Sequence, residues 1–89
     1  MKIDKINNTN FNAVNQKYLK KAIKEYNYLG SCTGELMECL RTDVYFKDIS
    51  PRDGIDTLEA IRPYAPRGIK ALNHIKDGFE YLLKHGYDY

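Results

Sequence analysis

Two cysteines and two histidines are the side chains of this 89-residue sequence best suited to metal binding. Zinc sites usually place about two to four residues between paired cysteines and about three to five between paired histidines. Here six residues separate Cys32 from Cys39, and ten separate His74 from His85. This spacing does not suit a shared ion, so we expect no metal and no other cofactor.

The same side chains are weak candidates for catalysis. A catalytic cysteine needs a base within hydrogen-bond reach and a third group that orients the base. The sequence leaves open a contact of Cys32 or Cys39 with His74, but free cysteines on an apolar helix face are usually small core residues. The acidic residues of 53–59 are explained by a solvated helix face. We therefore expect a non-enzymatic protein.

Four lysines form a basic stripe at helical spacing: Lys17, Lys20, Lys21 and Lys24. Such a stripe can follow a phosphate backbone, so nucleic-acid or nucleotide binding is an alternative function. A solvated helix face, which every small bundle needs, is the interpretation we favour for this stripe. The net charge is only +2, because residues 1–24 carry six lysines against one aspartate whereas residues 25–50 carry five acids against two bases.

Tyrosine dominates the aromatic content, with eight tyrosines, three phenylalanines and no tryptophan. A tyrosine combines a large apolar ring with a polar hydroxyl, and it is enriched at protein–protein interfaces. The composition therefore favours a protein-binding module.

Two surfaces are predicted to bind the partner. The first is the loop with Arg62, Tyr64 and Arg67, in which two prolines restrict the backbone. Replacing Tyr64 and Arg67 by alanine is expected to weaken binding without unfolding the domain. The second is a line on the last helix, formed at spacings of four, three and four by His74, Gly78, Tyr81 and His85.

Glycine within a helix leaves room for close approach. Either a partner or another helix of this chain would fill the space at Gly78. At the end of the sequence, Tyr87-Asp88-Tyr89 is compatible with a PDZ-type groove that adds an extended peptide to a sheet. Aromatic side chains that fold back onto the core are an equally good interpretation.

These residues require helices to position them. Apolar residues recur at steps of three and four from Phe11 to Val44, across a connection with two glycines. The pattern predicts one bent helix or two helices, and we favour two, at 11–29 and 32–46. Ser50 and Pro51 suit the start of another helix. Pro63 and Pro66 separate it from a last helix at 67–85.

The predicted fold is all-α, a small bundle of three or four helices. One domain is expected over 1–89, with a polar N-terminal segment at 1–10 and a C-terminal tail at 86–89. With 43% hydrophobic residues and neither an export signal nor a membrane span in the sequence, we expect a cytoplasmic protein. So small a core also makes a homo-oligomer plausible.

The function we predict is a small inhibitor or adaptor that docks on a larger protein. In size and in its lysine and asparagine content the chain resembles accessory products of phages and other mobile elements, including anti-defence inhibitors. Five asparagines among the first fifteen residues also resemble the leaders of type III secreted effectors. A host-cell effector that uses the tyrosine tail is therefore a third interpretation.

Overall fold

A computed structural model describes residues 13–87 and 89 of this chain. Within these residues the fold consists of four α-helices and one 3-10 turn, without strands, as the sequence predicts. The elements are α2 (Gln16–Leu29), α3 (Gly34–Tyr45), α4 (Pro51–Ile61), η1 (Arg62–Tyr64) and α5 (Ile69–Lys84). The polar segment 1–10 lies outside the described residues.

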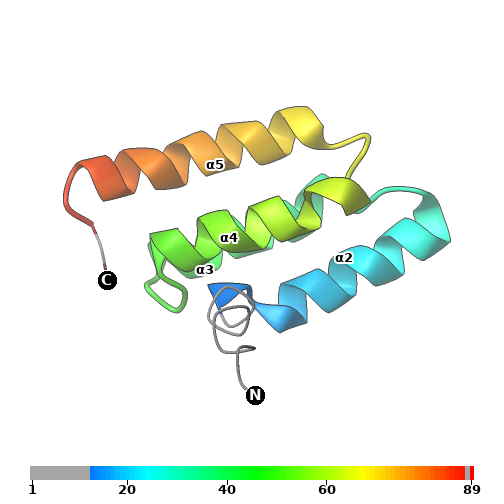
Figure 1. The fold of residues 1–89 in the computed structure, drawn as a ribbon, viewed down its shortest axis with the longest axis horizontal. Helices are drawn as coiled ribbons and strands as arrows, with labels where there is room; N and C mark the ends of the chain where they lie inside the picture. Colours follow the sequence, from blue (N-terminus) through cyan, green and yellow to red (C-terminus); the bar gives the residue numbers. More distant parts are fainter. Residues whose placement is uncertain (1–12, 88) are drawn as a thin grey trace, which may run out of the picture.

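Successive helices run in opposite directions, so α2 is roughly parallel to α4 and α3 is roughly parallel to α5 (Figure 1). α5 packs mainly on α4, and α3 lies behind α4 while also contacting α2 and α5. The C-terminal ends of α3 and α5 therefore lie at one end of the molecule, at the left in Figure 1.

The region 11–46 forms two helices, and Gly30 separates them. Gly30 has a φ of 86°, a left-handed conformation that ends α2 without the steric cost of a side chain. The predicted start of this first helix was wrong, because Val14 and Asn15 are not helical. Asn15 instead caps α2, since its side chain accepts a hydrogen bond from the Tyr18 amide at 3.3 Å. Phe11 lies outside the described residues.

The predicted start of α4 is confirmed. The Ser50 hydroxyl accepts a hydrogen bond from the Asp53 amide at 3.1 Å, and Pro51 occupies the first turn. The predicted last helix was too long by two residues at its start and by one at its end. Arg67 and Gly68 belong to the preceding loop, and α5 ends at Lys84, before Gly86 with its φ of 88°.

All four helices contribute to one core. Its buried hydrophobic side chains are Tyr18, Ala22, Cys32, Leu36, Met37, Leu40, Val44, Leu58, Ile61, Ala65, Leu72, Ile75 and Phe79. Thr57 is a buried polar residue that links two helices. Its hydroxyl donates to the Asp53 carbonyl at 2.7 Å and accepts from the Asn15 amide at 2.9 Å, which fixes the start of α2 on α4.

Candidate functional site

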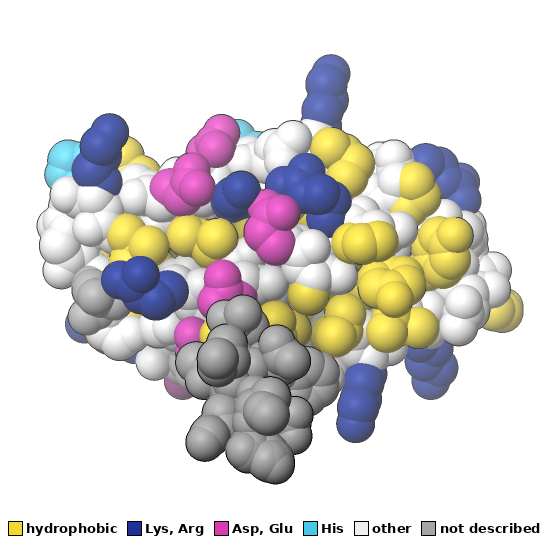
Figure 2. All heavy atoms as spheres, in the orientation of Figure 1, with side chains coloured by type: hydrophobic (Ala, Val, Ile, Leu, Met, Phe, Trp, Pro, Cys, Tyr) yellow, Lys and Arg dark blue, Asp and Glu magenta, His cyan; other side chains and the backbone are white. Residues whose placement is uncertain are grey.

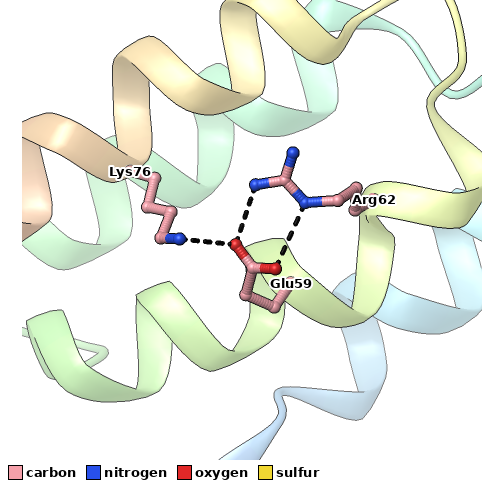
Figure 3. A network of polar contacts seen from close by, with 3 residues as sticks. All are labelled: Glu59, Arg62 and Lys76. Carbon is pink, nitrogen blue, oxygen red and sulfur yellow. Dashed lines mark hydrogen bonds and ion pairs between the residues drawn. The ribbon is translucent and has the colours of Figure 1, made fainter.

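The predicted loop surface is largely engaged within the chain, beginning with Arg62. Its guanidinium binds both carboxylate oxygens of Glu59, at 2.8 and 3.2 Å, and the Lys76 ammonium reaches the same carboxylate at 2.8 Å (Figure 3). Hydrogen bonds from Arg62 and then Lys76 lower the pKa of Glu59 to about 2. Arg62 therefore helps to hold α4, η1 and α5 together.

Tyr64 and Arg67 join this loop to the connection between α2 and α3. The Tyr64 carbonyl accepts from the Cys32 amide at 2.7 Å, and the Arg67 amide donates to the Ser31 hydroxyl at 3.2 Å. The Arg67 guanidinium also donates to the carbonyl of Leu29, at the end of α2. The Tyr64 carbonyl and the Arg67 amide are main-chain groups that alanine would keep, so of these three hydrogen bonds only that of the Arg67 guanidinium depends on a side chain.

The apolar surface beside this junction also makes contacts within the chain. Figure 2 shows hydrophobic side chains gathered over η1 and the C-terminal half of α2. There the rings of Tyr26 and Tyr64 pack edge to face, with centroids 5.6 Å apart. The half-buried Tyr64 ring also packs against the core, so this patch stabilises the fold.

The line of residues on α5 faces α3 of the same chain at Gly78. A Cβ placed on Gly78 would lie 3.5 Å from the Tyr45 hydroxyl, so Tyr45 occupies the space beside this glycine. His74 and Tyr81 remain exposed on either side. His85 is also exposed, and its ring stacks on that of Tyr81 at 4.1 Å between centroids.

A cleft of about 290 Å³ lies between α3 and α5 at this place. His74 and Tyr81 line it together with Arg41 and Tyr45, which sequence reasoning missed. The Arg41 guanidinium lies 5.8 Å from the centroid of the Tyr45 ring. A signal was available, because helical spacing places Tyr45 and Phe46 off the apolar stripe that ends at Val44.

Two exposed aromatic rings line this cleft, and two more follow at the C-terminal ends of α3 and α5. We call the group the aromatic face, and its members are Tyr45, Phe46, Tyr81 and Tyr87. Their exposed fractions are 50, 74, 61 and 54%, which is high for such large apolar side chains. The aromatic face therefore offers more uncovered ring surface than the predicted loop.

The tail folds back onto the core, which is one of the two interpretations given to it. The Tyr89 hydroxyl donates to the Val44 carbonyl at 2.6 Å, and the Lys47 ammonium lies 5.6 Å from the Tyr89 ring centroid. Burial raises the pKa of this phenol. Binding in a PDZ-type groove would require Tyr89 to leave these partners.

A larger groove lies between α2 and α3. A hollow of about 710 Å³ continues into one of about 400 Å³, and Lys21, Glu35, Leu36 and Cys39 line both. The wall from α2 is mainly basic, with Lys17, Lys21 and Lys24, and its one acid, Glu25, accepts from the Thr33 amide and hydroxyl. The wall from α3 is acidic, with Glu35, Glu38 and Asp43.

The acidic wall of this groove lies opposite most of the predicted lysine stripe. All four lysines are exposed, but three of them line a groove whose opposite wall carries carboxylates, and only Lys20 lies apart. A phosphate backbone laid along the stripe would meet those carboxylates. The groove therefore disfavours nucleic-acid binding at this face.

The cysteines and histidines do not meet in one place. Cys32 is buried in the core, where burial and then the nearby Glu25 raise the pKa of its thiol to about 11. Cys39 lines the α2–α3 groove, whereas His74 lines the α3–α5 cleft. Across residues 13–87 and 89, no group of three or more His, Cys, Asp or Glu side chains is placed to hold a metal ion.

No protein-family model, curated protein or solved structure matches this chain. In the part of the chain that the structure describes, no helix is both long enough and apolar enough to cross a bilayer.

Proposed function

We propose that this chain is a non-enzymatic protein-binding module, a small inhibitor or adaptor that docks on a larger protein through the aromatic face. The observation that carries the proposal is the exposure of four large rings, two of which line the α3–α5 cleft while the other two follow at the ends of its helices. An exposed apolar cluster of this kind is typical of a surface that a partner covers.

The residue types in and around the cleft support the same function. Tyrosine and arginine are over-represented among the residues that contribute most to binding energy. Tyr45 and Tyr81 flank the cleft, and Arg41 lies over the Tyr45 ring. Tyrosine also has few rotatable bonds, so fixing Tyr81 in an interface costs little conformational entropy.

The proposal is tested by affinity purification of the tagged protein from the cells that produce it, with nuclease present. We expect a stoichiometric partner band that Tyr81→Ala removes. Lys70→Ala is the control, because Lys70 is exposed but lines neither the α3–α5 cleft nor the α2–α3 groove. Circular dichroism checks that both variants remain folded.

Two results would contradict this assignment. One is a partner band that survives Tyr81→Ala, and the other is a band that Lys70→Ala removes equally well. If the wild-type protein instead carries nucleic acid without nuclease and no protein with it, the module binds nucleic acid and the aromatic face is not its site.

A further inference from the structure

The α2–α3 groove suggests a second interaction, separate from the aromatic face. Lys21 and Lys24 on α2 and Glu35 on α3 line its larger hollow, and none of the three forms an ion pair with another described residue. The groove therefore has a mainly basic wall and an acidic wall without an ion pair across it in the described part of the chain. Glu25 on the basic wall binds Thr33, and on the acidic wall Glu38 pairs with Arg41 and Asp43 accepts from Tyr18, which leaves Lys21, Lys24 and Glu35 for a second molecule.

We propose that a second copy of this chain covers the groove, wall against wall, which gives a symmetric dimer. A two-fold axis parallel to the groove exchanges its two walls. The basic wall of one copy then faces the acidic wall of the other along the whole contact. Such self-complementarity is what an isologous interface requires. A two-fold axis across the groove would place like charges together, so the charges select one arrangement.

The position of Lys21 and Glu35 gives this arrangement a specific contact. Both residues line both hollows, so they lie at the same level along the groove. The two-fold axis therefore brings Lys21 of each copy opposite Glu35 of the other. Tyr28 and Leu29, which are 87% and 49% exposed, lie on the groove wall and would be covered by the second copy.

Sedimentation equilibrium across a range of protein concentrations tests the proposal. We expect the wild-type protein to dimerise reversibly. Lys21→Glu and Glu35→Lys each turn two attractive pairs into repulsive ones and should weaken dimerisation at least about tenfold. Lys20→Glu makes the same charge change on α2 outside the groove, and Glu80→Lys makes the other on α5. Both controls should dimerise like the wild type.

An equimolar mixture of the two groove variants is the sharpest measurement. In the mixed dimer, the glutamate introduced at position 21 of one chain faces the lysine introduced at position 35 of the other, so this pair is attractive again. The second pair, Lys21 with Glu35, is the native one. The mixture should therefore dimerise at concentrations at which each variant alone remains monomeric.

Alkylation of cysteine locates the contact. Cys39 is exposed in the groove and Cys32 is buried, so Cys39 should react with iodoacetamide more slowly as the protein concentration rises.

A monomer at every concentration would overturn the proposal and leave the groove to a different partner. A dimer that the groove variants do not weaken, a mixture that fails to associate, or unchanged Cys39 reactivity would also overturn it.

Discussion

Gly54 of α4 lies directly against the ring of Phe79 of α5. A Cβ built on Gly54 would be 2.8 Å from Phe79 Cε2 and 3.0 Å from Val44 Cγ2, both closer than ordinary van der Waals contact. The Phe79 side chain is fully buried and cannot move aside freely. The absence of a side chain at Gly54 therefore allows α4 to approach α3 and α5 closely.

Gly54→Ala is expected to destabilise the fold by about 1–3 kcal/mol, because the added methyl group overpacks the core. Gly34→Ala is the matched control, since a Cβ at Gly34 meets nothing within 4 Å. Alanine there should be neutral or stabilising by up to about 1 kcal/mol. Urea denaturation measures both, and equal stabilities of the two variants would contradict the close contact.

Thr57→Val should cost about 1–3 kcal/mol, because it leaves the Asn15 amide without its acceptor in a partly buried position. Thr42→Val is a suitable comparison. Thr42 also donates to a carbonyl one turn earlier, but it is exposed. Hydrogen exchange of the first turn of α2 should increase in Thr57→Val alone. Equal protection in both variants would show that Thr57 does not hold α2.

The contacts of the Glu59 carboxylate with Arg62 and Lys76 make the free energy of unfolding depend on pH in the acidic range. The folded pKa of Glu59 is about 2, against an ordinary value of 4.5. Its contribution is therefore present above about pH 4.5 and is lost as the pH falls towards 2. Because the carboxylate is partly exposed, the contribution should be at most about 1 kcal/mol. Denaturation midpoints of the wild type and Glu59→Gln should converge as the pH falls, and a constant difference would contradict this.

Tyr18 should make the free energy of unfolding depend on pH in the alkaline range. Its ring is 4% exposed, and burial followed by the hydrogen bond to Asp43 raises its pKa above the ordinary value of 10. The stability that it contributes is present below pH 10 and is lost as the pH rises through the folded pKa. Tyrosinate absorbance should therefore show one tyrosine that ionises after the others, and Tyr18→Phe should remove it. If Tyr18→Phe instead removes a tyrosine that ionises early, the raised pKa of Tyr18 would be contradicted.

Arg67→Ala should lower the free energy of unfolding by about 1 kcal/mol, because the guanidinium no longer binds the Leu29 carbonyl. Lys70→Ala removes the same charge from an exposed position nearby and should have little effect. The thermal midpoint measures both. An unchanged midpoint in Arg67→Ala would show that the side chain is free for a partner, as the sequence analysis expected.

The local signals in the sequence predicted most of the helices. Ser50 and Pro51 mark the start of α4, and Gly30 and Gly86 end α2 and α5, because capping and chain termination depend on residues within one turn. The start of α2 was missed because Asn15 lies inside an apolar periodicity that continues before it. Spacing alone does not reveal that the amide of Asn15 is held by Thr57, 42 residues away.

The candidate site was predicted only in part. His74, Tyr81 and His85 are exposed as expected, whereas Tyr45 and Arg41 come from another helix and complete the cleft. Arg62, Tyr64 and Arg67 have the residue types of an interface, but in the fold they bind Glu59 and the α2–α3 connection. Residue type indicates what a side chain can do, and its neighbours decide which of those contacts it makes.

The sequence by itself determined that this protein is a small all-α bundle, that one helix begins at Ser50 and Pro51, and that tyrosine dominates its aromatic content. These properties follow from periodicity and capping, which act over a few neighbouring residues. Only the tertiary structure decided which tyrosines are buried, like Tyr18, and which are exposed, like Tyr81. It also placed the lysines of α2 across a groove from the acids of α3, because the packing of helices sets contacts between residues that lie far apart along the chain.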